Sequence, residues 1–395
     1  MQRPYVIILA VPGLRTRMLA VVSSAIPLGM LSLAIVLSVQ HWTGSFATAG
    51  ALSGLFGGGN ALGLALQGIA IDRFGARRTI LVSGLTCAAM LTGLGLGGRL
   101  GAPVALLAIT AAAAGVSIPA VTAAVRSWLG TALADPGLQG AAYAMLAALF
   151  QAGVTVGPAV VSVSLLLDEP SLAIGTAGLL VLLATMLLAG AGGDGEREHR
   201  EPSTSSRVRG PSSRPGLVTL SGVAFLHGAA LGVTAVAISA LTTESSRPVL
   251  AGITMTVLAL GEVGGALVYG AVDWTGSRPS RLPAVQSLAV VAALGVFLST
   301  GHSVLLLVAM FIAGVLAAPV AVLTSALLDE VVPDDAVGRA YSLIVASGLV
   351  ATALGNAVAG QLVDDIGARS LLLVPVMAIG AATTWSLARR STLRR

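Results

Sequence analysis

The sequence contains no lysine and a single cysteine, and only 10% of its 395 residues are charged, against about 25% in an average soluble domain. A soluble globular protein is excluded, because so few charges cannot cover a water-exposed surface. Because Cys87 is the single cysteine, an intrachain disulfide and a cysteine-built metal site are excluded. Without lysine the chain cannot form the P-loop of ATP-hydrolysing proteins. A hydrophobic content of 55% and a mean hydropathy of +0.93 exclude disorder and indicate a polytopic helical membrane protein.

Twelve apolar stretches are long enough to cross a bilayer, which requires about 20 residues of helix. They lie at 18–39, 46–70, 79–98, 102–126, 140–166, 172–191, 217–241, 248–271, 282–300, 303–328, 337–361 and 370–388. A segment rich in glycine, proline, serine and charge, 192–216, separates the sixth stretch from the seventh. The sequence therefore predicts an all-α membrane protein of two six-helix bundles, 1–191 and 217–395, joined by a cytoplasmic linker at 192–216.

The arginines predict the orientation in the membrane. With the N-terminus inside, only Arg99, Arg247 and Arg369 of the 22 basic residues lie in outside loops. Both termini are therefore expected in the cytoplasm. The arginine-only, alanine- and glycine-rich composition suggests a GC-rich bacterial genome, so we expect a multi-pass protein of a bacterial inner membrane. Because the membrane topology explains the net charge of +5, no nucleic-acid partner is expected.

The two halves of the sequence are related by duplication. Asp72, Gly75, Arg77 and Pro119 recur as Asp273, Gly276, Arg278 and Pro319, 200 or 201 residues later. Parallel repeats of this kind are a transporter architecture, in which the substrate site lies between the halves near the bilayer midplane.

The segment from Gly68 to Arg78 reads G-I-A-I-D-R-F-G-A-R-R. It resembles the loop signature of the major facilitator superfamily, G-x-x-x-D-R-x-G-R-R, and departs from it only at Ala76. With the twelve spans and the second copy, the resemblance covers the whole chain and implies the fold of bacterial drug or metabolite efflux members. It also implies a gating role for this loop and its copy, that is, for Gly68, Asp72, Arg73, Gly75, Arg77 and Arg78, and for Asp273, Gly276 and Arg278. The alternative for Arg77 and Arg78 is simple anchoring on the cytoplasmic side.

The fifth span contains Gly153-x-x-x-Gly157-Pro158. This pattern is similar to the end of a signature found in antiporters of the superfamily, although Ala144 and Val161 replace two of its glycines. The resemblance favours export by antiport.

Glu262 is the one carboxylate predicted well inside a span, and such groups are usually functional. His227 lies at a similar depth in the preceding span, about 15 Å from the cytoplasmic side. Adjacent antiparallel helices can bring the two together, and a histidine–carboxylate pair can hold and release a proton. The alternative is structural, with His227 bonded to a backbone carbonyl and Glu262 protonated and capped by a hydroxyl. Proton antiporters of the family often carry an arginine early in helix 4 and an acid in helix 1, both missing here, so the expected coupling falls on Glu262.

Uncharged polar residues within the spans are candidates to line a substrate cavity, and the alternative for each is a hydrogen bond between helices. They are Ser23, Ser24, Asn60, Gln67, Gln151, Thr234, Ser347 and Asn356. Helix breaks or bends are expected at Pro27, Pro119, Pro158 and Pro319. With only 4 tryptophans, 4 tyrosines and 7 phenylalanines, a weakly polar substrate fits better than a cation held in an aromatic cage.

These features predict a secondary active transporter that works by alternating access, exports a small molecule in exchange for protons, and acts as a monomer in the lipid bilayer. No cofactor or metal is expected. Proton symport or facilitated uptake is the alternative within transporters. A membrane-embedded enzyme would need several polar groups at one depth, and a sensor would usually carry a further soluble domain, so neither is favoured.

Overall fold

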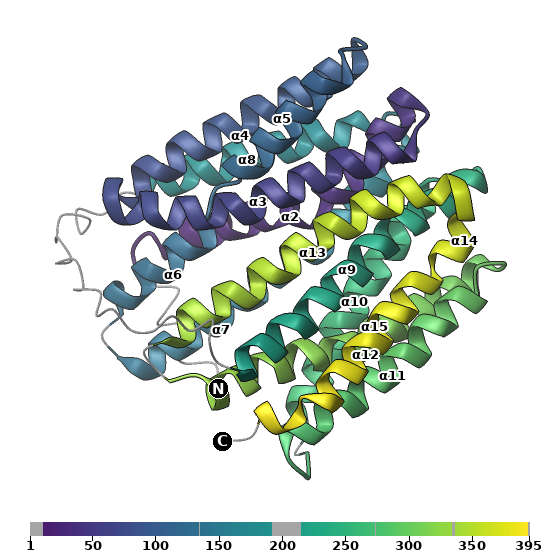
Figure 1. The fold of residues 1–395 in the computed structure, drawn as a ribbon. Helices are drawn as coiled ribbons and strands as arrows, with labels where there is room; N and C mark the ends of the chain where they lie inside the picture. Colours follow the sequence, from purple (N-terminus) through teal and green to yellow (C-terminus); the bar gives the residue numbers. More distant parts are fainter. Residues whose placement is uncertain (1–10, 134, 192–214, 273, 334–335, 394–395) are drawn as a thin grey trace. The chain divides into compact units, whose positions relative to one another are not determined.

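The computed structural model describes residues 11–133, 135–191, 215–272, 274–333 and 336–393, and the described residues form helices and connections without strands. Among these described residues, twelve helical segments are long and apolar enough to span a membrane, which confirms the predicted all-α class and number of spans. Figure 1 shows their arrangement within the fold. They are Leu14–Thr43, Phe46–Phe74, Ala76–Arg99, Val104–Ala132, Leu138–Leu166, Ser171–Gly190, Pro215–Glu244, Val249–Ala271, Arg278–Leu298, Ser303–Val331, Val337–Ile366 and Ala368–Ala388.

The chain divides into two compact units. Unit 1 comprises residues 1–38 and 59–203, and unit 2 comprises residues 39–58 and 204–395. The hairpin at 39–58 belongs to unit 2, so two helices pass from one unit to the other. Most of the predicted linker, 192–214, lies outside the described residues, and the predicted domain bounds stay a prediction.

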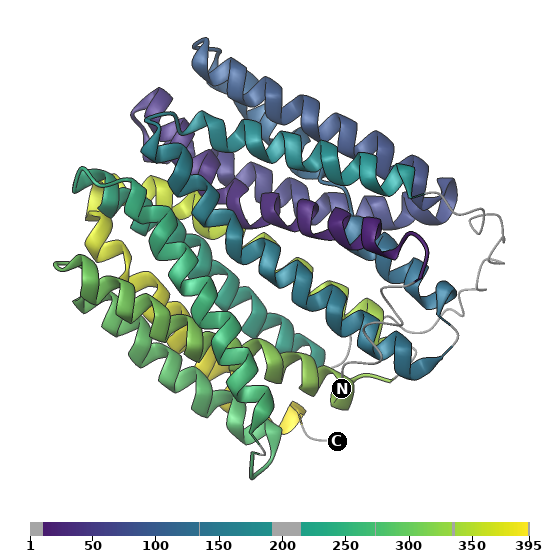
Figure 2. The same ribbon diagram turned by 180° about the vertical axis from the view of Figure 1, so that it is seen from behind.

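Unit 1 contains α4 to α8 and the parts of α2 and α3 outside residues 39–58, and Figures 1 and 2 show these helices from two sides. These are α2 (Leu14–Thr43), α3 (Phe46–Phe74), α4 (Ala76–Arg99), α5 (Val104–Ser117), α6 (Val121–Ala132), α7 (Pro136–Leu166) and α8 (Ser171–Gly190). Helix α4 packs against both α5 and α8. A buried cluster that includes Leu14, Val21, Val125, Leu129 and Leu146 joins α2, α6 and α7. Apolar burial within the bundle thus fixes α6 beside two full-length helices.

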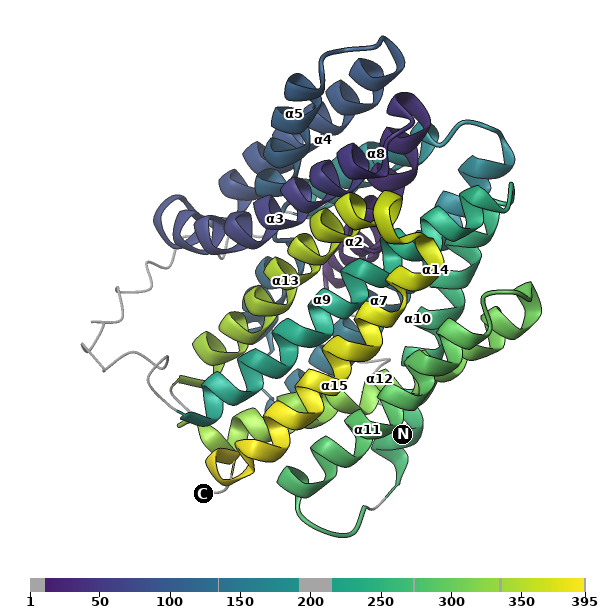
Figure 3. The same ribbon diagram turned by 45° about the vertical axis from the view of Figure 1, so that its right-hand side comes forward.

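Unit 2 contains the helices from α9 onward, which are labelled in Figure 3. Its helices are α9 (Pro215–Glu244), α10 (Val249–Ala271), α11 (Arg278–Leu298), α12 (Ser303–Val331), α13 (Val337–Ile366), α14 (Ala368–Leu371) and α15 (Leu373–Ala388), followed by the 3₁₀ turn η4 (Arg390–Leu393). Helix α9 packs on α13 and α15, and α10 packs on α12.

Small residues permit the closest of these contacts. A Cβ at Gly232 of α9 would lie 3.0 Å from the backbone nitrogen of Asn356 in α13. At Gly265 of α10 it would lie 2.7 Å from the Cα of Val315 in α12. Because lipid is as apolar as leucine, membrane helices gain most from such close backbone approach.

Of the four prolines at which a break or bend is expected from the sequence, one interrupts its helix. Pro27, Pro158 and Pro319 lie inside the continuous helices α2, α7 and α12, so these helices are not broken there, and bends at these prolines stay a prediction. Pro119 does interrupt its span, since α5 ends at Ser117 and α6 begins at Val121. The fourth span was predicted as one stretch and is instead two helices.

Candidate functional site

The predicted gating loop is a tight turn between α3 and α4. Gly75 has a φ of +84°, a left-handed conformation that favours glycine. Its carbonyl accepts hydrogen bonds from the backbone N–H of Thr79, at 3.2 Å, and from the Thr79 hydroxyl, at 2.9 Å. Asp72 is exposed, and no ion pair joins it to another residue in the part of the chain that the structure describes.

The remaining polar members of the signature also face outward from this turn. Arg73, Arg77 and Arg78 are exposed, and the guanidinium of Arg73 lies 5.3 Å from the ring centre of Phe74. Gly68 is on α3, and a Cβ there would meet open space. Four charges on one exposed turn are therefore available to a partner surface.

The second copy of this turn connects α10 to α11. Gly276 has a φ of +87°, close to that of Gly75, so the duplicated sequence gives a duplicated backbone conformation. Arg278 donates from Nη1 to Oε1 of Glu330 at 2.6 Å, forming an ion pair with the end of α12. Asp273 lies outside the described residues. Glu330 was missed as a partner, although its place at the end of the tenth span on the same side as Arg278 was a usable signal.

Aromatic side chains brace the second turn. The rings of Tyr269 and Trp274 stack at 4.8 Å, and the Trp274 indole N–H donates to the Tyr269 carbonyl at 2.8 Å. Arg281 donates from Nη1 to the Tyr269 hydroxyl at 3.3 Å. Sequence reasoning did not identify this group.

The glycines of the fifth-span pattern face α2. A Cβ at Gly153 would lie 2.6 Å from the Cβ of Ala25, and one at Gly157 would lie 2.6 Å from the carbonyl carbon of Gly29. Pro158 follows in the same helix and is buried. These residues allow α7 and α2 to touch along their backbones.

His227 and Glu262 lie in neighbouring helices of unit 2, α9 and α10, which are in contact. The Nδ1 of His227 bonds the Val223 carbonyl of its own helix at 3.0 Å, while its Nε2 is buried and has no hydrogen-bond partner among the described residues. Glu262 is partly buried in the middle of α10. In the described ranges, no hydrogen bond or ion pair connects the two side chains.

The candidate cavity-lining residues fall into two groups. Those whose side chains bond a backbone carbonyl of their own helix are Ser24 to Val21, Thr234 to Ala230 and Ser347 to Leu343. Those bonded to another helix are Asn356, whose Nδ2 donates to Ser53 Oγ at 3.1 Å, and Gln67, which bonds the backbone between α5 and α6. Ser23 and Asn60 are buried, and Gln151 is partly buried.

A cavity of about 300 Å³ lies elsewhere in unit 2, at the α9–α10 and α11–α12 connections. Arg247, Thr242 and Ser303 are among its lining residues, whereas Glu262 and His227 are not. The described residues include no group of three or more His, Cys, Asp or Glu side chains able to hold a metal ion.

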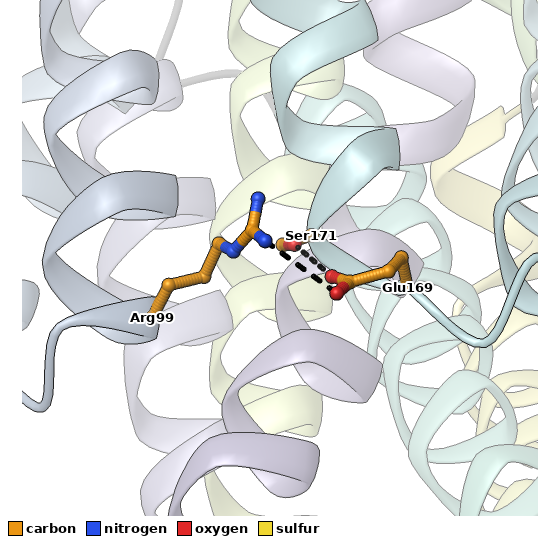
Figure 4. Close-up of polar contacts among 3 residues, drawn as sticks. All are labelled: Arg99, Glu169 and Ser171. Atoms are coloured by element: carbon orange, nitrogen blue, oxygen red, sulfur yellow. Dashed lines mark hydrogen bonds and ion pairs between the residues drawn. The ribbon is translucent and has the colours of Figure 1, made fainter.

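The α7–α8 connection of unit 1 is held by a charged contact (Figure 4). Arg99, at the end of α4, lies 3.5 Å from Oε1 of Glu169, and the Ser171 hydroxyl donates to Oε2 of the same carboxylate at 3.1 Å. Both charged side chains are about half exposed, with 52% and 45% of their surface accessible. The contact ties two loops at one end of the unit and is far along α4 from the signature turn.

The family is decided by a comparison that covers both halves. The model of the Major Facilitator Superfamily matches residues 17–219 and again residues 220–394. The chain belongs to the Major Facilitator Superfamily. As a superfamily member whose described residues include twelve apolar helices, it is a multi-pass membrane transporter rather than an enzyme, as the sequence predicted.

Named relatives and solved structures agree with this membership. The enterobactin exporters EntS of Escherichia coli O139:H28 and of Shigella boydii serotype 18 are each 27% identical to this superfamily member over 366 residues, covering 89% of this chain and 85% of theirs. The nucleoside transporter NupG has a TM-score of 0.72 at 16% identity, covering 97% of this chain and 99% of its own. A bacterial homologue of the human lysosomal transporter Spinster, solved in an inward-facing and occupied conformation, has a TM-score of 0.63 at 14% identity, covering 96% and 95%. The two solved structures establish a shared fold.

Proposed function

We propose that the protein exports a small molecule in exchange for protons by alternating access. The observation that carries the proposal is Glu262, a carboxylate about 14 Å from the nearer end of a membrane-spanning helix. Charged carboxylates at such depth are costly, so they are retained chiefly where they bind ions or relay protons. Glu262 is the proposed proton carrier.

His227 is the second member of the proposed relay. Its Nε2 is buried without a hydrogen-bond partner among the described residues, and it lies about 18 Å from the start of α9, a depth close to that of Glu262. An unpaired imidazole nitrogen can accept a proton from, or return it to, a carboxylate on a contacting helix when the helices shift.

Two observations support export as the direction. The relatives described above, which match most of the chain, are enterobactin exporters. The antiporter-like pattern of the fifth span, whose Gly153 and Gly157 pack against α2, also favours export. We therefore propose a small, weakly polar export substrate and take enterobactin as the first compound to test.

The proposed orientation places both termini, the linker and the α3–α4 turn in the cytoplasm of a bacterial inner membrane. In this arrangement Asp72, Arg73 and Arg77 gate the cytoplasmic side. Their exposure leaves them free to form contacts in one conformation and lose them in the other, which is how a charge cluster biases a two-state equilibrium.

The test uses everted membrane vesicles with an acidic interior and a pH-sensitive dye. Enterobactin and a panel of small metabolites are added to wild type, to Glu262→Gln and to Glu244→Gln, a control that neutralises an exposed carboxylate at the end of α9. We expect substrate to release protons from the vesicles in wild type and Glu244→Gln and not in Glu262→Gln. Proton release that survives in Glu262→Gln would contradict the role of Glu262. Proton movement in the opposite direction would favour symport.

A further inference from the structure

The fourth span is broken within unit 1. Helix α5 ends at Ser117 and α6 begins at Val121, leaving Ile118, Pro119 and Ala120 outside regular helix. Pro119 has no N–H to donate, and its ring excludes a regular helical bond to the preceding turn. Inside a membrane, the backbone groups released by such a break must find partners within the protein, because no water is present to replace them.

Gln67, on the neighbouring helix α3, provides these partners. Its Nε2 donates to the Ile118 carbonyl at 2.6 Å and to the Val116 carbonyl at 3.2 Å. Its Oε1 accepts from the backbone N–H of Ala120 at 3.0 Å. The side chain is only 6% exposed, and one amide group thus bonds the backbone on both sides of Pro119.

Small residues on α3 bring Gln67 within reach of the break. A Cβ at Gly63 would lie 2.8 Å from the carbonyl carbon of Val116, and one at Gly59 would lie 2.6 Å from the carbonyl oxygen of Ala112. Helix α3 therefore runs along the end of α5 at backbone contact.

The described residues of the second half have neither feature at the corresponding positions. Pro319, which corresponds to Pro119, lies inside the continuous helix α12. Val268, 201 residues after Gln67, is an exposed apolar side chain. The break and the amide thus occur together in one half and are both missing from the other, which indicates that the amide serves the break.

The break sets the direction of α6, a helix of 12 residues. The Arg17 guanidinium lies 3.9 Å from the ring centre of Trp128, and the Arg126 guanidinium lies 5.0 Å from that of Tyr143. These contacts tie α6 to α2 and α7. Gln67 also directly precedes Gly68 in α3, so it lies between the signature turn and the break.

We propose that Gln67 is a positioning residue for transport, whose amide holds the Ile118–Ala120 break and transmits movement of the α3–α4 turn to α6. The transport part of this proposal rests on the proposed function. The structural part, that Gln67 fixes the direction of α6, does not.

The structural part is tested by distance measurements within unit 1. Cys87 is replaced by serine, and spin labels are attached to cysteines at Thr131 of α6 and Gly190 of α8, both exposed. We expect one narrow distance distribution in this background and a broader, shifted one after Gln67→Leu. The control is Gln361→Leu, which makes the same substitution at an exposed position of α13. A distribution unchanged by Gln67→Leu would overturn the proposal.

Pro119→Ala, which restores a backbone N–H and permits a continuous helix, tests whether the amide of Gln67 serves the break. Gln67→Leu alone should lower the melting temperature by about 5 °C, since it removes up to three buried hydrogen bonds. In the Pro119→Ala background the same change should have a clearly smaller effect, because the backbone groups then pair within the helix.

If Gln67 positions α6 for transport, substrate-dependent proton release should fall at least tenfold in Pro119→Ala and in the double variant, although both remain folded. A double variant that is stable and transports like wild type would show a purely structural role and overturn the proposal. If wild type itself moves no protons with any compound, the proposed function fails, while the distances and melting temperatures still decide the role of Gln67 in the fold.

Discussion

Replacing Gly157 by alanine tests how tightly the fifth-span pattern binds α7 to α2. The added Cβ would lie 2.6 Å from the Gly29 carbonyl carbon, 2.7 Å from the Met30 nitrogen and 2.8 Å from the Ile26 oxygen. Non-bonded carbon atoms settle at about 3.5–4.0 Å, and backbone atoms cannot rotate away as a side chain can. The two helices must therefore separate by about 1 Å, and overpacking of this kind costs about 1–3 kcal/mol.

The lone cysteine provides the assay. Cys87 is buried in α4 of the same unit, so a thiol-reactive dye reports the unfolding of that unit during heating. We expect Gly157→Ala to lower the melting temperature by about 3–10 °C. The control is Gly175→Ala in α8, where a Cβ meets nothing within 4 Å and the melting temperature should not fall. A Gly157→Ala protein that melts at or above the wild-type temperature would refute the packing argument.

Three further substitutions probe other contacts. Arg278 and Glu330 form an ion pair whose side chains are 48% and 35% exposed. Glu330→Gln should therefore lower the stability by about 0.5 kcal/mol and the melting temperature by about one or two degrees, and the difference should disappear in about 1 M salt. A difference that persists in salt would mean that the pair is not held by charge. Gly58 and Gly59 are neighbours in α3. A Cβ at Gly58 would meet open space, whereas a Cβ at Gly59 would lie 2.6 Å from the carbonyl oxygen of Ala112. Gly58→Ala should therefore keep or raise the melting temperature, and Gly59→Ala should lower it; equal effects would contradict the close contact of α3 with α5.

The spans could be predicted from the sequence because bilayer thickness imposes a length on every apolar stretch. The turns at Gly75 and Gly276 can also be predicted from the sequence, since a recurring glycine with the same neighbours indicates a recurring left-handed turn. Which proline breaks its helix could not be predicted from the sequence. Pro119 and Pro319 occupy matching positions, and only the former has a glutamine on the adjacent helix to bond the released backbone.

The side chains of His227 and Glu262 show a second limit of prediction from the sequence. Sequence position gives the depth of His227 and Glu262 along their helices, because each residue adds about 1.5 Å. It does not give the direction in which each side chain points around the helix, which depends on the partner helices. Here α9 packs mainly on α13 and α10 on α12, and His227 bonds its own helix at Val223. Similar depth is therefore not enough to predict a hydrogen bond between the two.

The duplicated halves have kept the same turn and diverged in their intramembrane polar groups. In unit 1 a glutamine holds an interrupted helix, and in unit 2 a histidine and a glutamate lie in continuous ones. A broken helix can change direction at little cost once its backbone groups have side-chain partners, whereas a carboxylate within the membrane changes its interactions when it binds or releases a proton. Under the proposed function, the first half therefore contributes a helix that can change direction to the transport cycle, and the second half contributes groups that bind and release protons. This difference gives a reason for the sequence symmetry to be lost at these positions while it is retained at the turns.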